Sequence, residues 1–356
     1  MTTNEIQKSS EQQVELIRVD RLYESLRYNE YSPENGMGEI VDNSVEAGAT
    51  CIDVRITRIK QLGKGRPKTK IDEIAVADNG CGMDQNVLSK CLALGESIRP
   101  TNRVKLGIGR FGVGMTLGSI SLACKVEVYS RTSADADFLY TYIDLEEIKN
   151  REQLYIPVPI VKSPAEEYRT LLAGQSGTIV VLKKCDRITG DLEGLANYLG
   201  RTYRKFIEKG IKITLGFRME HESVFRVEPV YLHDPLYIAG PTKFDVENRQ
   251  AGKPMDPKAE DWGTIRITKE IEGHPGKADV VIRLTLLPEE WRMVEGAGGS
   301  PEAKKRKIHE NEGVSILRAD REVLYGHVPF ITGARGASKA LDIDRFWGCE
   351  ISFPPE

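Results

Sequence analysis

The stretch that decides the fold is residues 39–50, EIVDNSVEAGAT. It lies in a predicted helix that begins after Ser32, a hydroxyl N-cap followed by proline, and that ends at Gly48. Steps of about 100° per residue separate a polar sector from an apolar sector, and we expect the apolar side to face a sheet and the polar side to face away from it. The polar sector holds Glu39, Asp42, Asn43 and Glu46, and the apolar sector holds Met37, Ile40, Val41, Ser44 and Val45.

This polar sector has two interpretations. Taken alone, a polar face on an amphipathic helix is most often a solvated surface. The functional alternative is that Glu39 and Asn43, which lie one turn apart, orient a water molecule and hold a hard cation through oxygen. The helix by itself leaves both interpretations open.

Two further motifs follow later in the sequence. Residues 78–83, DNGCGM, follow a predicted strand over 73–77, and their glycines would allow either a sharp turn or close approach to a flat ligand. Residues 107–115, GIGRFGVGM, lead into a predicted helix over 115–122, whose free N–H groups and dipole would suit a phosphate chain. The glycine cluster is no P-loop, because no Gly-Lys-Ser/Thr ends it, and it lacks the strand-turn context of a dinucleotide fold.

In this order, and followed by residues 177–182, GTIVVL, the motifs resemble the four nucleotide-binding motifs of the GHKL ATPases, the superfamily of gyrase, heat-shock chaperones, histidine kinases and MutL. The first motif looks most like MutL, and the third looks more like the chaperones and the MORC ATPases. The resemblance covers residues 20–185 well. It implies an α+β fold: a GHKL (Bergerat) ATP-binding sandwich of helices on a mixed sheet, followed by a ribosomal-S5-like α+β transducer domain.

The resemblance also implies roles for individual residues. Glu39 would be the general base that polarises the attacking water, and Asn43 would be the Mg²⁺ ligand. Glu46 stands where the family usually has Asp, with a contact through water. Asp78 would accept the adenine amino hydrogen, supported through water by Thr178. Gly82 and Met83 would shape the base pocket, residues 95–112 would form a lid over ATP, and the phosphate-binding segment would comprise Gly107, Gly109, Arg110, Phe111, Gly112, Val113, Gly114 and Met115.

The chain is expected to divide into a polar N-terminal arm over 1–20, an ATP-binding domain over 21–187 and a transducer-like domain over 188–356. We expect a helix near 19–28 before the first motif, a helix over 85–94, a strand over 177–184 that closes the first sheet, and a helix over 192–209 that opens the second half. The second half is similar to the transducer domain of gyrase, MutL and MORC proteins. Its predicted strands are 211–219, 264–271, 278–287, 314–318 and 350–353, and residues 290–308 are predicted to be a loop.

In the related families a transducer lysine reaches the γ-phosphate from a loop just past a late strand. Residues 349–356 look like that strand, and the sequence stops there. The expectation is therefore a fragment that lacks this lysine, with Lys339 or residues 304–307 as weak substitutes.

Composition excludes several classes of protein. The chain has 356 residues, and 50 Lys and Arg against 53 Asp and Glu give a net charge of −3, which is too near neutral to predict a partner. It has no apolar stretch of the roughly 18 residues that a membrane helix needs and no signal-peptide core, so we expect a cytoplasmic protein without membrane contact. The dispersed cysteines and histidines disfavour a zinc site, a disulfide framework or a histidine-centred site.

Two basic runs, residues 60–70 and 304–307, could contact DNA phosphates, although solvated loops are the commoner interpretation and no aromatic residues interleave with them. The run at 304–307 also resembles a nuclear-import signal. A histidine kinase is disfavoured because no His-bearing dimerisation helix precedes the ATP domain. The resulting hypothesis is a Mg²⁺-dependent, ATP-gated homodimeric clamp acting in DNA repair, chromosome handling or defence. The alternatives are a chaperone-like ATPase with protein clients, and an ATP-dependent scaffold for an effector elsewhere.

Overall fold

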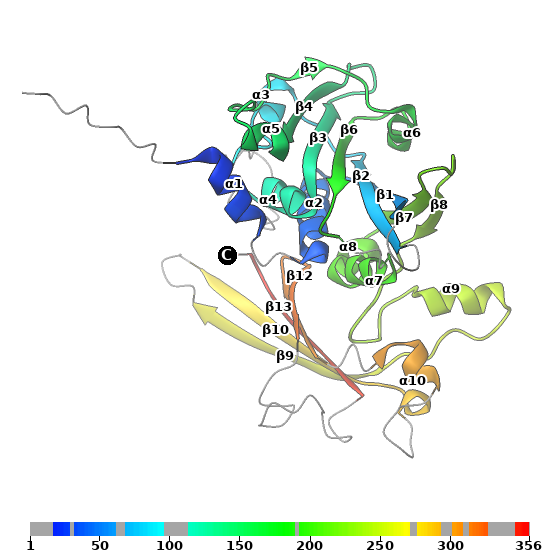
Figure 1. Cartoon of the computed structure of the whole chain (residues 1–356). Helices are drawn as coiled ribbons and strands as arrows, with labels where there is room; N and C mark the ends of the chain where they lie inside the picture. The colour runs from blue at the N-terminus through cyan, green and yellow to red at the C-terminus, as the bar shows by residue number, and fades with distance from the viewer. Residues whose placement is uncertain are drawn as a thin grey trace, which may run out of the picture.

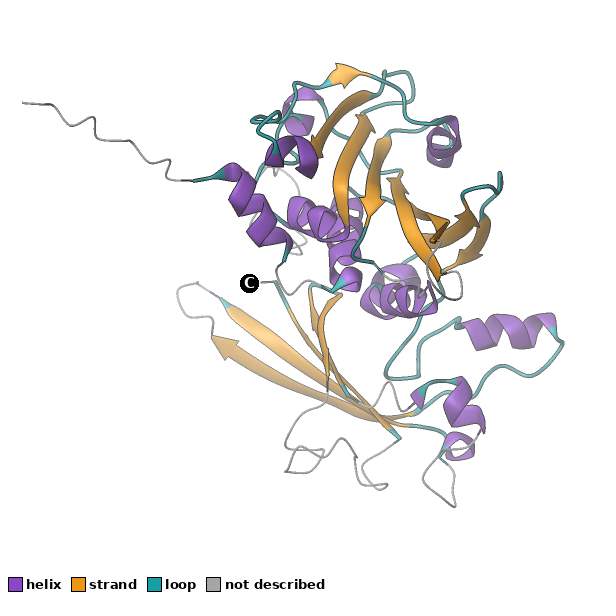
Figure 2. Ribbon diagram, in the orientation of Figure 1, coloured by secondary structure: helices purple, strands orange, loops and turns teal. Residues whose placement is uncertain are grey.

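The computed structural model describes residues 17–28, 32–61, 68–95, 113–188, 192–270, 276–292, 301–308, 313–326 and 346–355. These residues form an eight-stranded mixed sheet and a five-stranded mixed sheet with helices packed on them, which is the expected α+β class (Figures 1 and 2).

The first sheet has the strand order β5-β4-β3-β6-β2-β1-β7-β8, and β1 and β7 are its parallel pair. In β1 the alternate residues Ile52, Val54 and Ile56 are fully buried on one face. The strand predicted over 177–184 lies in the middle of the sheet instead of closing it, since it pairs with both β2 and β3. The strands are β1 (Cys51–Gln61), β2 (Lys68–Asp78), β3 (Ala123–Arg131), β4 (Leu139–Asp144), β5 (Ile160–Val161), β6 (Gly177–Cys185), β7 (Lys212–Met219) and β8 (Arg226–Pro229).

By strand pairing, the first sheet therefore extends past residue 187, the expected end of the ATP-binding domain. The two strands β7 and β8 come from the second half of the chain and pair onto the edge of β1. Local periodicity predicts that a segment is a strand, but it carries no information about which sheet a parallel crossover will join.

Helices cover one face of this sheet and bury the main core. Met37, Ile40, Ile120, Leu199 and Tyr203 pack together on that face with the inward side chains of the strands. The helices that contribute are α2 (Pro33–Glu46), α4 (Gly114–Leu122), α7 (Leu192–Thr202) and α8 (Arg204–Glu208), and α1 (Val19–Arg27), close to its predicted position, contacts α4 and α5 (Leu145–Lys149).

A smaller apolar cluster lies on the opposite face. Ala75, Tyr129 and Ile179 of the strands pack there against Tyr168 of α6 (Glu166–Arg169) and Leu172 of the short 3-10 helix η1 (Thr170–Leu172). Because both faces bury apolar side chains, the sheet lies between two layers, of which the larger is the predicted layer of helices.

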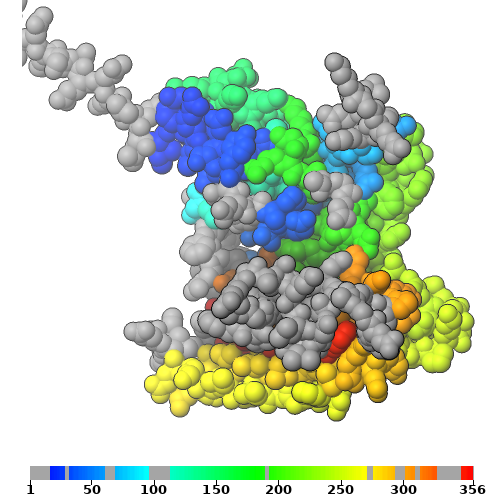
Figure 3. All heavy atoms as spheres, turned by 60° about the horizontal axis from the view of Figure 1, so that its bottom comes forward, coloured from blue at the N-terminus to red at the C-terminus, as the bar shows by residue number. Residues whose placement is uncertain are grey.

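The second sheet has the order β12-β11-β13-β10-β9, in which β11 and β13 are parallel. In Figure 3, β9 and β10 (yellow) form the lower edge of the molecule. The helix α10 lies within the segment 290–308, so the predicted loop is wrong at α10, and residues 293–300 of that segment lie outside the described residues. The elements are α9 (Lys243–Gln250), β9 (Glu260–Glu270), β10 (Lys277–Leu286), η2 (Glu289–Trp291), α10 (Pro301–Lys305), β11 (Val314–Arg318), β12 (Arg321–Gly326) and β13 (Trp347–Phe353).

Two predicted helices have different lengths in the structure. The helix expected over 85–94 is only α3 (Gln85–Leu88), and the helix expected over 192–209 is interrupted between α7 and α8 at Tyr203, where φ is −105°. Both α7 and α8 contact β12 and so lie between the two sheets (Figure 1). None of the described helices is long and apolar enough to span a bilayer.

Candidate active site

Helix α2 positions the first two candidate residues. Its N-terminus is capped by Ser32, whose Oγ accepts a hydrogen bond from Asn35 N at 3.2 Å. Glu39 is half-buried and Asn43 is exposed one turn later. The Asn43 Nδ2 atom donates to the Glu39 carbonyl oxygen at 2.7 Å, which leaves the Asn43 Oδ1 oxygen, the atom that a magnesium ion requires, outside this bond.

The Glu39 carboxylate lies directly against the first turn of α4. A Cβ atom built on Gly114 would lie 2.0 Å from Glu39 Oε2, and one built on Gly118 would lie 2.8 Å from Glu39 Cβ and 2.7 Å from the Gly36 carbonyl oxygen. The absence of side chains at these two glycines therefore makes room for Glu39. The unpaired N–H groups of a first helical turn favour a nearby negative charge, so the first and third sequence motifs meet at this point.

Asp78 ends β2 and is only 5% exposed. Its Oδ1 atom accepts a hydrogen bond from Gly80 N at 2.9 Å, and its Oδ2 atom accepts one from Ser44 Oγ at 3.2 Å. Burial raises the pKa of Asp78 to about 6, and these two hydrogen bonds oppose the shift. The carboxylate is therefore mostly ionised at pH 7 and can accept a hydrogen from a ligand.

Ser44 lies on α2 directly after Asn43, so its hydrogen bond joins the Asp78 carboxylate to that helix. The helical pattern places Ser44 in the apolar sector, so sequence reasoning did not include it among the site residues. Its hydroxyl on a buried helix face was the available signal, since a buried hydroxyl needs a polar partner.

The structure brings Thr178 next to Asp78, because the two residues are paired across β6 and β2. The Thr178 hydroxyl lies 2.9 Å from the hydroxyl of Ser130 on β3. Ser130 also accepts a hydrogen bond from Met83 N at 2.8 Å and donates one to the Gly177 carbonyl oxygen at 3.1 Å. Ser130, which sequence reasoning also missed, thus ties the second motif to the fourth.

The turn after Asp78 is held in place by backbone geometry. Gly82 has φ +66°, and a Cβ atom there would lie 1.9 Å from the Arg131 carbonyl oxygen, so only glycine fits. Asn79 Oδ1 accepts hydrogen bonds from the backbone nitrogens of Thr50 at 2.9 Å and Cys51 at 2.8 Å. These bonds fix the turn against the connection between α2 and β1.

The remaining predicted residues are only partly described. Glu46 is the last residue of α2, and Val113 and Met115 flank Gly114 at half-buried positions. The predicted lid over 95–112, apart from residue 95, and residues 1–16 of the predicted arm lie outside the described residues, as do Gly107, Gly109, Arg110, Phe111 and Gly112.

These residues fit a nucleotide with magnesium. A buried carboxylate at Asp78 suits the amino group of a base, and the first turn of α4 suits phosphate oxygens. Across the described ranges, no three His, Cys, Asp or Glu side chains gather as a metal site. A cation at Asn43 would therefore take most of its ligands from phosphate and water, as magnesium commonly does.

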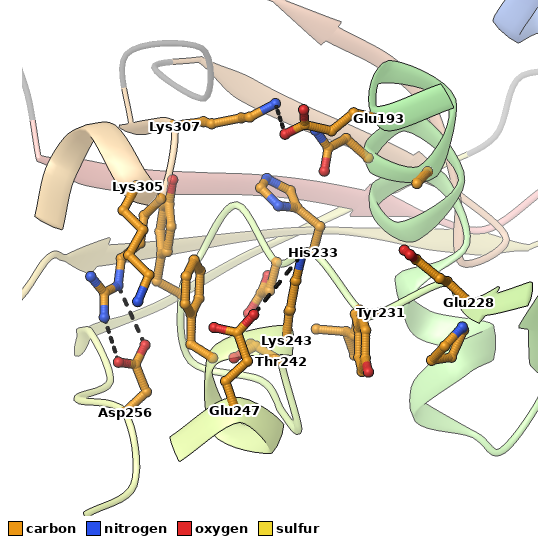
Figure 4. Close-up of a pocket in the computed structure, with 18 of the residues that line it drawn as sticks. Glu193, Glu228, Tyr231, His233, Thr242, Lys243, Glu247, Asp256, Lys305 and Lys307 are labelled. Carbon is orange, nitrogen blue, oxygen red and sulfur yellow. Dashed lines mark hydrogen bonds and ion pairs between the residues drawn. The ribbon is translucent and has the colours of Figure 1, made fainter. Parts of the chain in front are cut away.

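A cavity of about 540 Å³ lies elsewhere, between α7, β8, α9 and α10 (Figure 4). None of the predicted site residues lines it. Its wall includes Lys307, paired with Glu193 at 2.8 Å, and Arg306, which is 6% exposed and forms an ion pair with Asp256. Two of the four basic residues at 304–307 are thus held in internal ion pairs, whereas Lys304 and Lys305 are exposed.

Comparisons with known proteins agree with this geometry. Residues 31–178 match the family described as histidine kinase-, DNA gyrase B-, and HSP90-like ATPases. The chain is 32% identical over 100 residues to Protein MICRORCHIDIA 1 of Arabidopsis thaliana, covering 27% of this chain and 14% of that protein. It is 33% identical over 114 residues to the DNA mismatch repair protein MutL of Erwinia tasmaniensis, covering 32% and 17%. The matches thus span less than a fifth of each relative.

The fold as a whole also has a counterpart among solved structures. A structure titled as the N-terminal domain of a DNA repair protein superposes with a TM-score of 0.50 at 12% identity, covering 95% of this chain and 87% of that one. The likeness extends over both sheets and concerns the fold alone.

Proposed function

Residues 31–178 match the GHKL-type ATPase family, and from this premise we propose that the protein is a Mg²⁺-dependent ATPase that acts as an ATP-gated dimeric clamp in a DNA-related process. The observation that carries the catalytic part is the position of the Glu39 carboxylate, which lies against the first turn of α4, where phosphates would be received.

In this proposal each motif has one task. Asp78 accepts the amino hydrogen of adenine, while Ser44 orients its carboxylate and Thr178 lies beside it on β6. Gly82 and Met83 border the base, and Glu46, near the end of α2, acts through water. The amides around Gly114 receive phosphate oxygens, and Glu39 polarises the water that attacks the terminal phosphate.

Asn43 would hold the magnesium ion through its side-chain oxygen, with phosphate oxygens and water as the other ligands. When bound, the ion supplies positive charge that stabilises the charge developing on the phosphate oxygens. The residues of the protein orient the water and position the phosphates, so catalysis rests on geometry and electrostatics.

The test compares Mg²⁺-ATP turnover by wild type and by Glu39→Ala, with Glu34→Ala as a matched control on the first turn of the same helix. We expect Glu39→Ala to bind ATP and to lose turnover, and Glu34→Ala to keep both. Asp78→Ala should lose binding of a fluorescent ATP analogue. Normal turnover by Glu39→Ala would remove the general-base role, and unchanged binding by Asp78→Ala would remove the base contact.

The DNA-related role is supported by the name of one relative, the DNA mismatch repair protein MutL. The clamp is proposed from the resemblance of the four motifs to the GHKL ATPases. Sedimentation with and without a non-hydrolysable ATP analogue tests dimer closure, and deletion of residues 1–16 tests whether the arm contributes to it. Turnover that rises with duplex DNA and falls steeply with salt would support a DNA partner. If turnover does not change with DNA and the protein suppresses the aggregation of an unfolded client protein, the chaperone alternative is supported.

A further inference from the structure

A buried ion pair joins the catalytic helix to the second sheet. Asp42 on α2 is 7% exposed, although the helical pattern places it in the polar sector that faces away from the sheet. Its carboxylate accepts hydrogen bonds from two guanidinium nitrogens of Arg321 on β12, Nε at 3.1 Å and Nη2 at 2.9 Å. Such two-point contacts fix both distance and orientation.

Further contacts hold the same part of α2. The Tyr203 hydroxyl lies 2.7 Å from Asp42 Oδ1 and 2.7 Å from the Gly38 carbonyl oxygen. A Cβ atom on Gly38 would lie 2.6 Å from the Tyr198 hydroxyl and 3.2 Å from Arg321 Nη2. The α7–α8 region and β12 therefore press closely against the backbone of α2 here.

Arg321 is itself held by its neighbours. The adjacent Glu322 accepts hydrogen bonds from Arg201 at 2.7 Å and from Arg204 at 3.0 Å. Arg204 is 1% exposed and also contacts Glu350 on β13 at 2.8 Å. Arg201 and Arg204 thus bind β12 and β13 to α7 and α8. A movement of the second sheet would therefore move Arg321 relative to α2.

The charges of the pair depend on each other. Asp42 is 7% exposed and the Arg321 side chain is 15% exposed, so both charges are largely removed from water. Loss of either partner leaves the other buried without its counter-charge, so the pair forms or breaks as a unit.

Asp42 lies between the two candidate catalytic residues on α2. It directly precedes Asn43 and lies three residues after Glu39, so any rotation or shift of this turn moves both side chains. Building on the proposed ATPase function, we propose that Asp42 and Arg321 are positioning residues that set the orientation of α2 for hydrolysis. ATP turnover thereby depends on where the second sheet sits.

The test uses Arg321→Gln and Asp42→Asn, which remove the ion pair but keep the approximate shape, and Arg321→Lys, which keeps the charge but loses the two-point contact. The control is Lys209→Ala. It removes an exposed ion pair with Asp320, 2.5 Å long, which joins the residue after α8 to the turn before β12 without reaching α2. Thermal unfolding identifies variants that are folded.

We expect Arg321→Gln and Asp42→Asn to lower kcat about 10- to 100-fold while KM changes less than about threefold. The Mg²⁺ concentration for half-maximal ATP binding should rise about tenfold, a readout that needs no hydrolysis. Arg321→Lys should be intermediate, Lys209→Ala should match wild type, and the double variant should be no worse than the poorer single variant.

The positioning role would be overturned if both pair variants kept the wild-type kcat and Mg²⁺ requirement while Glu39→Ala was inactive. That outcome would leave the ATPase proposal standing. Effects as large in Lys209→Ala would also overturn it, because they would show general sensitivity of the interface. Absence of ATP binding by wild type would refute the ATPase proposal and this inference with it.

Discussion

Replacing Gly114 by alanine tests the placement of the Glu39 carboxylate. The added Cβ would lie 2.0 Å from Glu39 Oε2, whereas ordinary contacts begin near 3.4 Å, so the carboxylate must move by 3.4 − 2.0 = 1.4 Å. A displacement of about 1 Å at a catalytic group can cost about 100-fold in rate. We therefore expect kcat to fall about 100-fold, which corresponds to about 2.7 kcal/mol of transition-state stabilisation.

The stability of Gly114→Ala should change little. The atom in the way is the end of a flexible side chain, and alanine is a better helix former than glycine by up to about 1 kcal/mol. Gly118→Ala provides the contrast, because its Cβ would lie 2.7 Å from the rigid Gly36 carbonyl oxygen and 2.8 Å from Glu39 Cβ. That variant should lose stability as well as activity.

The assay is steady-state ATP turnover beside thermal unfolding, with Gly276→Ala as the neutral control because no atom of the described residues lies within 4 Å of its added Cβ. The reasoning predicts an inactive but stable Gly114→Ala, an unstable Gly118→Ala and an unchanged Gly276→Ala. Turnover of Gly114→Ala within threefold of wild type, while Glu39→Ala is inactive, would show that the carboxylate does not work from this position.

Three more predictions concern the base-binding end of the site. Burial raises the pKa of Asp78 to about 6, so the affinity for an ATP analogue should fall about tenfold per pH unit below 6, and a flat profile from pH 5 to 7 would contradict this. The raised pKa also means that the contribution of Asp78 to the free energy of unfolding is complete below its unfolded pKa of about 3.8 and is lost as pH rises through 6. Asp78→Asn should therefore be more stable than wild type at pH 7, by about 2–3 kcal/mol, and no more stable than wild type at pH 3.5. Urea unfolding at the two pH values measures this difference. Gly82→Ala should destabilise the protein by at least about 2 kcal/mol and weaken nucleotide binding, because its Cβ would meet a backbone carbonyl oxygen at 1.9 Å, and unchanged thermal unfolding would show that the turn relaxes.

Local sequence patterns predicted the helix that carries the first motif. The Ser32 cap and the apolar sector are local properties, and Glu39 and Asn43 lie one turn apart on α2 as expected. The resemblance to the GHKL ATPases implied that Asp78 and Thr178 would lie close together, and they are paired across β2 and β6.

The remaining features depend on partners that are distant in the sequence. Asp42 looks like a solvated residue until Arg321, 279 residues later, covers it. Ser44 and Ser130 look like minor members of buried faces until their hydroxyls are seen to hold Asp78 and Met83. Periodicity shows which face of an element is apolar, but it does not show which distant element packs there.

The parallel pairing of β1 with β7 determines where the chain can be divided. The family match ends at residue 178, yet the outer neighbour of the 11-residue strand β1 is contributed by residues 212–219. A chain cut at 187 would leave that edge of β1 without its hydrogen-bonding partner, and unpaired edges of this kind invite association between molecules. Because β8 in turn pairs with β7, we expect the smallest part that folds independently to include β8, and we expect the nucleotide-binding segment alone to fold poorly.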